Sequence, residues 1–184
     1  MRMGGKIGLV TAAGSGIGRA GAIRFAKEGA SVGVVDIDAD AVAAVVAEIE
    51  AGGGKALGIT ADLSKDEDSR RIVRNTVNHF NGLDFVWNHV GHPGPAVVED
   101  LDMQDWDQAV DLNLRTVFIT TESALPELRA RGGGSLLFTA SSSGLTGSIF
   151  SPVYSMAKFG VVGLVKAMAK RYAKENIRIN AVCP

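Results

Sequence analysis

The chain has 184 residues, of which 46% are apolar and 21% are charged, a balance typical of one globular domain with a sizeable core. This balance excludes a disordered tail or a collagen-like chain, because both lack the apolar share that forms a core. The 19 basic and 20 acidic residues give a net charge of −1 without a basic cluster, so no nucleic-acid partner is expected.

Short aliphatic runs alternate along the chain with longer segments of helical period. They are predicted to be strands buried on both faces, as in a parallel sheet that helices cover. The six predicted strands are residues 6–11, 31–36, 55–60, 83–88, 135–140 and 177–182.

Helices are predicted between these strands from their start and stop signals. Helical periodicity begins at Ile17, directly after the first strand. Asp38 is expected to cap a helix over residues 39–51, which three consecutive glycines end. Ser64 and Glu67 have the spacing of a capping box ahead of a third helix.

Two longer helices complete the pattern. One is predicted to start at Asp102 or Asp105 and to end near residue 129, and the other to start at Ser151 or Pro152 and to end near residue 174. Strands and helices therefore alternate, which predicts an α/β fold with a doubly wound parallel sheet, the Rossmann fold, with six strands present.

The first strand ends in a glycine-rich turn that leads into a helix. The turn comprises Thr11, Ala12, Ala13, Gly14, Ser15, Gly16, Ile17 and Gly18. Backbone N–H groups at such a helix start bind anions, and the helix dipole favours a diphosphate. The glycine spacing alone also fits a simple tight turn, but its place in the first strand–helix unit favours a dinucleotide site.

Asp36 ends the second strand, eighteen residues after Gly18. A carboxylate at this distance can accept hydrogen bonds from the ribose hydroxyls of adenosine. It would repel the 2′-phosphate of NADP by about 4 kcal/mol at 4 Å and an effective dielectric constant of 20. NAD is therefore the expected cofactor, and NADP is disfavoured.

Tyr154 and Lys158 stand four residues apart on one predicted helix face. A phenol is a poor base at neutral pH, and a nearby ammonium favours its phenolate form. Such a pair alone could equally be a surface contact. The hydroxyl of Ser141, however, follows the fifth strand at the sheet edge where doubly wound proteins bind ligands.

Taken together, these residues resemble the short-chain dehydrogenase/reductase family over essentially the whole chain. The motifs follow the order of that family. A TGxxxGxG-like loop stands at residues 11–18, and Asp62-Leu63 resembles the acid-containing pair that meets the adenine. An NNAG-like motif runs from Asn88 to Gly91, Asn113 matches the active-site Asn, Ser141 lies thirteen residues before Tyr154, and residues 180–184 resemble the start of an N-A-V-x-P-G segment.

The resemblance implies an enzyme that interconverts a secondary alcohol and a ketone with NAD. Tyr154 would be the general base or acid, Lys158 would assist it and bind the nicotinamide ribose, Ser141 would polarise the substrate oxygen, and Asn113 would hold a water. The implied cofactor-binding residues are Thr11, Gly14, Ser15, Gly16, Ile17, Gly18, Asp36, Asp62, Leu63, Asn88, Gly91, Tyr154 and Lys158. A homodimer or homotetramer is also expected.

Two alternatives remain open. One is an NADPH-dependent carbonyl reductase of the 3-oxoacyl type, which Asp36 disfavours, and the other is a non-catalytic dinucleotide-binding domain. The chain departs from the family pattern at Ala12, which replaces a glycine, and at His89 and Val90, which replace Asn and Ala. His89 and His92 have an HxxH spacing, but no third ligand is evident, so no metal is expected.

The resemblance and the composition also predict domain extent and compartment. Family members continue past Pro184 with a seventh strand and a lid, so residues 1–184 are expected to be a single NAD(P)-binding domain that is incomplete at its C-terminus. The lone Cys183 fits a reducing compartment, and the N-terminus lacks a secretory signal. We therefore expect a cytoplasmic protein with no membrane partner.

Overall fold

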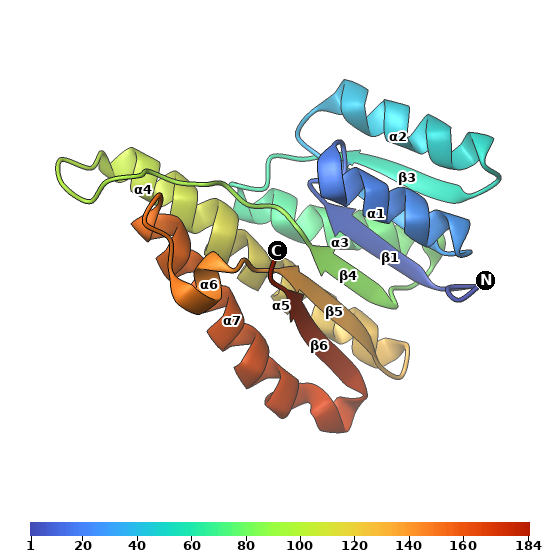
Figure 1. The fold of residues 1–184 in the computed structure, drawn as a ribbon. Helices are drawn as coiled ribbons and strands as arrows, with labels where there is room; N and C mark the ends of the chain where they lie inside the picture. Colours follow the sequence, from blue (N-terminus) through green and yellow to red (C-terminus); the bar gives the residue numbers. More distant parts are fainter.

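A six-stranded parallel sheet forms the middle layer of the computed structural model, which describes residues 1–184 (Figure 1). Its strands are β1 Ile7–Thr11, β2 Ser31–Asp36, β3 Lys55–Thr60, β4 Phe85–Asn88, β5 Gly134–Thr139 and β6 Ile177–Val182. They lie in the order β3-β2-β1-β4-β5-β6, so the predicted doubly wound sheet is confirmed. The order reverses between β1 and β4, and ligands bind such sheets outside the carboxyl ends of the strands at this point.

Helices cover both faces of the sheet. They are α1 Gly16–Lys27, α2 Ala39–Ala51, α3 Asp66–Phe80, α4 Met103–Val110, α5 Thr116–Ala130, α6 Ser143–Thr146 and α7 Pro152–Tyr172, with a π-helical turn at Asp111–Arg115 and a 3₁₀ turn at Ala173–Glu175. Alternate strand residues feed two separate cores: Leu9 packs in the core under α3, α5 and α7, and the next residue, Val10, packs in the core under α1 and α2.

The predicted starts of α2 and α7 are confirmed, and in each helix one side chain caps the first turn. Asp38 caps α2 by accepting hydrogen bonds from the N–H groups of Asp40 and Ala41, both at 3.0 Å. Ser151 caps α7, because its hydroxyl accepts from the N–H of Tyr154 at 3.3 Å. Both helices therefore begin at the predicted positions.

One helix prediction was wrong, and another lacked a local detail. Ser64 does not cap α3, because its hydroxyl donates to Asp62 at 2.7 Å, and the helix begins two residues later. The predicted helix from Asp102 to about residue 129 is confirmed, with Asp102 as its cap: helical backbone runs without a break through α4 and α5, and the π-helical turn at Asp111–Arg115 lies inside it. A further short helix, α6, follows β5 and was not predicted.

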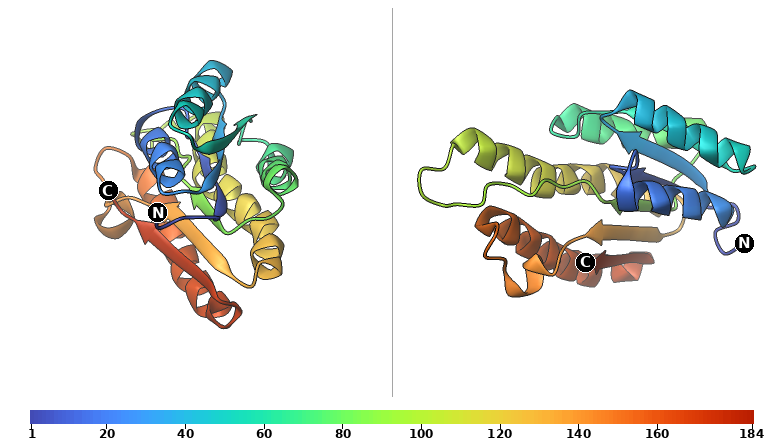
Figure 2. Two further views of the ribbon diagram at one scale, coloured as in Figure 1. Left: turned by 90° about the vertical axis from the view of Figure 1, so that its right-hand side faces the viewer. Right: turned by 45° about the horizontal axis from the view of Figure 1, so that its top comes forward.

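The segment that follows β4 and the helix α4 extend beyond the carboxyl edge of the sheet, as Figure 2 shows from two further directions. None of the helices combines the length and the apolar character that a membrane crossing requires.

Two large apolar side chains on neighbouring helices are about half exposed: Phe118 on α5 at 58% and Phe159 on α7 at 47%. The expected homo-oligomer stays a prediction.

Asp84 anchors the opposite, amino-terminal edge of the sheet. Its side chain is 8% exposed and accepts from the N–H of Ile7 at 2.9 Å, from Arg131 at 3.2 Å and from Lys6 at 3.3 Å. Burial alone would raise the pKa of this carboxyl, but the Ile7 N–H and the two cations outweigh burial and hold the pKa below its usual range. The ionised form of Asp84 therefore stabilises the folded chain.

We predict that Asp84→Ala lowers the free energy of unfolding at pH 7 by about 1–3 kcal/mol, because it leaves the Ile7 N–H and two cations without their acceptor. A folded-state pKa below the unfolded value of about 3.9 stabilises above that value, and this contribution is lost as the pH falls through the folded-state pKa. The difference between variant and wild type in urea unfolding should therefore shrink below about pH 4. Glu67→Ala, which breaks an exposed pair with Arg74, is the control and should change stability by less than about 1 kcal/mol.

Candidate active site

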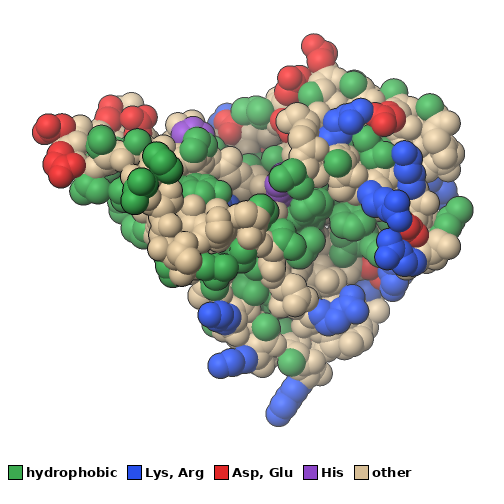
Figure 3. Space-filling view, viewed as in Figure 1, with side chains coloured by type: hydrophobic (Ala, Val, Ile, Leu, Met, Phe, Trp, Pro, Cys, Tyr) green, Lys and Arg blue, Asp and Glu red, His purple; other side chains and the backbone are tan.

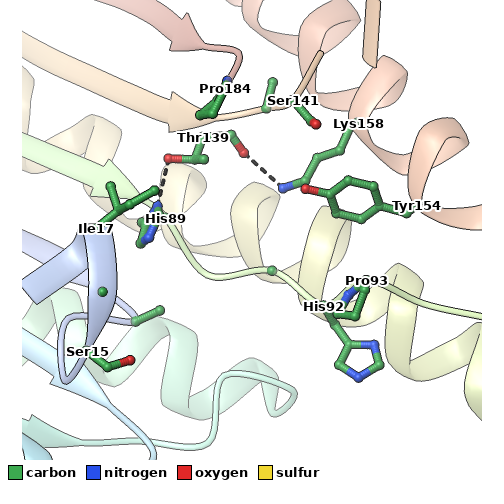
Figure 4. A pocket seen from close by; sticks show the side chains of 14 residues that line it. Ser15, Ile17, His89, His92, Pro93, Thr139, Ser141, Tyr154, Lys158 and Pro184 are labelled. Atoms are coloured by element: carbon green, nitrogen blue, oxygen red, sulfur yellow. Dashed lines mark hydrogen bonds between the residues drawn. The ribbon is translucent and has the colours of Figure 1, made fainter. Parts of the chain in front are cut away.

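A cavity of about 530 Å³ opens at the carboxyl ends of β1, β4 and β5 (Figure 4). Its walls come from the glycine turn, the loop after β4, the end of β5 and the start of α7. The lining residues are Ala12, Ser15, Gly16, Ile17, His89, Gly91, His92, Pro93, Thr139, Ala140, Ser141, Tyr154, Lys158 and Pro184. The fold thus brings the predicted phosphate turn and the predicted catalytic side chains to one space.

A second cavity of about 370 Å³ lies beside the first and shares Ala12 and Gly91 with it. The predicted residues Asp36, Asp62 and Leu63 line this second cavity. The two cavities together span the ends of five neighbouring strands, from β3 through β2, β1 and β4 to β5. An elongated ligand can therefore occupy both.

The glycine turn presents the start of α1 to the first cavity. Ser15 precedes the helix without a side-chain cap, and no acidic residue stands in the first turn. The N–H groups of a first helical turn have no partner within the helix, so this uncompensated end suits an anion. Gly18 must lack a side chain, because a Cβ there would lie 2.1 Å from the carbonyl oxygen of Ala12.

Ala12 adopts a left-handed backbone conformation with φ at +50°. This is the position where the chain has alanine in place of a glycine. A residue with a Cβ in this region costs about 1–2 kcal/mol relative to its ordinary conformation. The turn therefore keeps a glycine-like shape at a cost in stability.

Asp36 holds the turn as well as facing the second cavity. One carboxylate oxygen accepts from the N–H of Gly14 at 2.8 Å, and the other accepts from Ile37 at 2.8 Å and from Asp38 at 3.3 Å. The carboxylate stays half-buried at the cavity wall. It thus connects the end of β2 with the start of the phosphate turn.

Asp62 is likewise ordered by its neighbours. The hydroxyl of Ser64 donates to it at 2.7 Å, and this bond, opposed by partial burial and aided by the Ser64 N–H and by Lys65, lowers the pKa of Asp62. The side chain is therefore an ionised acceptor at the wall of the second cavity.

Tyr154, Lys158 and Ser141 meet at the first cavity. The Lys158 ammonium lies 5.3 Å from the centre of the Tyr154 ring and donates to the carbonyl oxygen of Thr139 at 2.9 Å. Burial lowers the pKa of Lys158 from 10.5 to about 8. Ser141 accepts from the N–H of Ser143 at 3.1 Å, which leaves its own hydrogen free to donate into the cavity.

Asn113 lies behind this group rather than at the cavity wall. It is fully buried in the π-helical turn, and its amide donates to the carbonyl oxygens of His92 at 2.7 Å and of Ala109 at 2.8 Å. A Cβ on Gly91 would lie 2.9 Å from its oxygen and 3.2 Å from the Lys158 nitrogen. Asn113 therefore fixes the loop that passes between itself and Lys158.

Thr11 and Asn88 do not line either cavity. Thr11 is fully buried, and its hydroxyl accepts from the N–H groups of His89 at 2.8 Å and Val90 at 3.0 Å. Asn88 is buried and donates to Thr121 at 3.4 Å. Both predicted cofactor residues support the strand ends that carry the cavity wall.

Two residues of the cavity wall are not among the predicted site residues: His89, which the sequence marks only as a replacement in the NNAG-like motif, and Thr139. The Nδ1 atom of His89 lies 2.9 Å from the hydroxyl oxygen of Thr139. Thr139 could have been found from its position at the carboxyl end of a central strand. The two histidines of the HxxH spacing have different partners, since His92 Nδ1 accepts from the N–H of Gly94 at 3.2 Å.

Comparisons with known proteins agree with this geometry. The family model described as short chain dehydrogenase matches residues 6–184. Cyclohexanol dehydrogenase from Acinetobacter sp. (strain SE19) is 41% identical over 180 residues, which are 97% of this chain and 72% of that protein. The 3-oxoacyl-[acyl-carrier-protein] reductase FabG of Thermotoga maritima is 33% identical over 184 residues, all of this chain and 75% of that protein.

A solved structure has nearly the same fold. It is a 7α-hydroxysteroid dehydrogenase complexed with NADH and 7-oxo glycochenodeoxycholic acid. The TM-score is 0.95 at 34% identity, and the match covers all of this chain and 71% of that one.

We predict that Lys158→Met raises the free energy of unfolding at pH 7 by about 1–2 kcal/mol. A pKa lowered from 10.5 to about 8 means that burying the ammonium costs about 3 kcal/mol, and loss of the bond to Thr139 offsets about 1 kcal/mol of the gain.

Urea titrations against pH measure this effect. Between about pH 8 and pH 10 the unfolded wild-type chain binds a proton that the folded chain has released, so its stability rises with pH, and the variant should lack this rise. Lys166→Met, at an exposed position of the same helix, is the control and should behave like the wild type. A Lys158→Met variant less stable than the wild type at pH 7 would contradict the argument.

Proposed function

The chain belongs to the short-chain dehydrogenase family, and on that basis we propose that it is an NAD-dependent oxidoreductase that interconverts a secondary alcohol and a ketone. The observation that carries the proposal is the meeting of Ser141, Tyr154 and Lys158 at one cavity, directly opposite the uncapped start of α1. A hydroxyl donor, a phenol and an ammonium at a phosphate-binding turn are the groups that this reaction requires.

The residues present fit a nicotinamide dinucleotide. The free N–H groups of α1 would hold its diphosphate, Asp36 would accept from the ribose hydroxyls, and Asp62 with Leu63 would border the adenine in the second cavity. When bound, this cofactor accepts or supplies the hydride. The side chains of this protein would orient the substrate and carry out the proton transfer.

Tyr154 takes the proton of the alcohol in oxidation and returns it in reduction. The Lys158 ammonium beside the ring stabilises the phenolate that forms, and Ser141 donates its hydrogen bond to the substrate oxygen. Asn113 acts at a distance from the substrate, because it holds the loop against which Lys158 lies. These roles make Tyr154 the only proton carrier at the reacting oxygen.

The relatives support an alcohol or ketone as substrate. The name of the Acinetobacter relative specifies a secondary alcohol, cyclohexanol, and the steroid dehydrogenase structure holds NADH. The Thermotoga relative is a 3-oxoacyl reductase, which keeps an NADPH-dependent carbonyl reductase as the second candidate. The Asp36 carboxylate at the cavity wall favours NAD over that alternative.

We predict that Tyr154→Phe lowers kcat by about a hundredfold to ten-thousandfold, because the variant lacks the proton carrier but keeps the ring. The dissociation constant for NADH should stay within about twofold of the wild type in calorimetry. Tyr172→Phe, which changes the other tyrosine of the chain, is the control and should leave both quantities unchanged. Wild-type turnover in Tyr154→Phe would rule out the assignment, and NADH binding without turnover by the wild type on any alcohol would favour a non-catalytic binding domain.

We also predict that Asp36→Asn shifts the ratio of kcat/KM values for NADP and NAD toward NADP by about tenfold or more. The amide removes the repulsion toward a 2′-phosphate and still accepts from the N–H of Gly14, so the turn keeps its shape. Asp40→Asn, an exposed neutralisation in the first turn of α2, is the matched control. An unchanged ratio in Asp36→Asn would show that this carboxylate does not select the cofactor.

A further inference from the structure

Three side chains at the carboxyl ends of β4 and β5 form a hydrogen-bonded chain that the proposed reaction does not use. The indole N–H of Trp87 donates to the hydroxyl of Thr139 at 2.9 Å. The same hydroxyl lies 2.9 Å from Nδ1 of His89, and Figure 4 shows this second contact. His89 stands where the family pattern has an asparagine. The chain therefore carries an imidazole where its family motif has an amide.

The direction of these hydrogen bonds follows from the donors. An indole nitrogen can only donate, so the Thr139 oxygen accepts from Trp87. The hydrogen of the Thr139 hydroxyl has one acceptor within reach, which is Nδ1 of His89. Burial and the Lys158 ammonium lower the pKa of His89, which favours the neutral ring at pH 7. With Nδ1 accepting from Thr139, the one hydrogen of a neutral ring is on Nε2.

The position of the ring directs this hydrogen to the cavity. The imidazole packs 5.1 Å from the Trp87 ring, and its Cδ2 atom lies 2.8 Å from the place that a Cβ on Gly18 would take. Nε2 is bonded to Cδ2, so it lies on the side of α1 rather than on the side of Thr139. It has no protein hydrogen-bond partner, and His89 lines the first cavity.

We propose that His89 is a cofactor-binding residue that donates its Nε2 hydrogen to the diphosphate of the nicotinamide dinucleotide. This inference rests on the proposed function. The diphosphate is the favoured acceptor, because the ring lies against the first turn of α1, whose free N–H groups face the same anion. A neutral imidazole held by Thr139 adds one fixed donor beside that turn.

The first experiment determines the tautomer in the wild-type protein. Nitrogen-15 spectra of imidazole-labelled protein distinguish a ring nitrogen that carries hydrogen from one that accepts a hydrogen bond. The expected result is hydrogen on Nε2 at pH 7, with a shift of that resonance when ADP-ribose is added. Hydrogen on Nδ1, or a resonance that ADP-ribose does not move, would overturn the proposal.

The second experiment compares variants by their binding of three probes. His89→Phe keeps a ring but has no donor, so the dissociation constants of NADH and ADP-ribose, measured by calorimetry, should rise about tenfold to a hundredfold. Adenosine, which has no phosphate, should bind with unchanged affinity in ligand-observed NMR. His89→Gln places an amide nitrogen near the position of Nε2 and should restore affinity for both phosphate-containing probes to within a few-fold of the wild type.

The other outcomes separate the possibilities. Equal weakening for all three probes in both variants would assign His89 a merely structural role, and weakening for NADH alone would exclude the diphosphate as its partner. Wild-type affinities in His89→Phe would also overturn the inference. A wild-type protein that binds neither NADH nor NADPH would instead contradict the proposed function itself, and circular dichroism melts establish that each variant is folded.

Discussion

The hydroxyl of Thr11 joins the ends of β1 and β4, and both cavities depend on that junction. It accepts from two consecutive N–H groups after β4, at 2.8 and 3.0 Å, and donates to the carbonyl oxygen of Trp87 at 3.4 Å. The glycine turn begins at Thr11 itself, and the loop that contains Gly91 follows β4 on the other side of the junction. A buried hydroxyl with all its bonds satisfied thus sets the spacing between the glycine turn and the wall that carries Ser141, Tyr154 and Lys158.

Much of the fold follows from local patterns. The six aliphatic runs all form strands. The predicted burial on both faces is confirmed for β1, β2 and β4 but is wrong for β3 and β6, because these strands lie at the sheet edges and expose several of their residues. The caps at Asp38 and Ser151 also follow from one side chain each. The π-helical turn could not be predicted from helix propensity; it contains Asn113, whose amide donates to the carbonyl oxygens of His92 and Ala109.

The candidate site shows the same division. The order of motifs predicts which residues gather at the carboxyl edge, since strand ends in a parallel sheet meet there. Their hydrogen bonds depend on the other residues that the fold brings to the same place. Ser64 has the spacing of a cap, yet Asp62 accepts its hydroxyl hydrogen, and Thr11 belongs to the coenzyme motif, yet its side chain is enclosed between two strands. Which acceptor a hydroxyl group uses therefore depends on residues that the fold brings near it, and local sequence spacing alone does not determine it.

Trp87 occupies the space that the missing side chain of Gly21 leaves, since a Cβ there would lie 2.0 Å from the indole ring. The fluorescent side chain of Trp87 is thus 8% exposed and packs against α1. Its ring centre lies 5.1 Å from that of His89, which lines the first cavity. Its emission overlaps the absorption of a reduced nicotinamide, so energy transfer from this indole is sensitive to what enters the cavity. Figure 3, in the same view as Figure 1, shows apolar side chains gathered near the middle of this face of the molecule. The packing of one glycine against one tryptophan therefore gives the protein an intrinsic optical reporter.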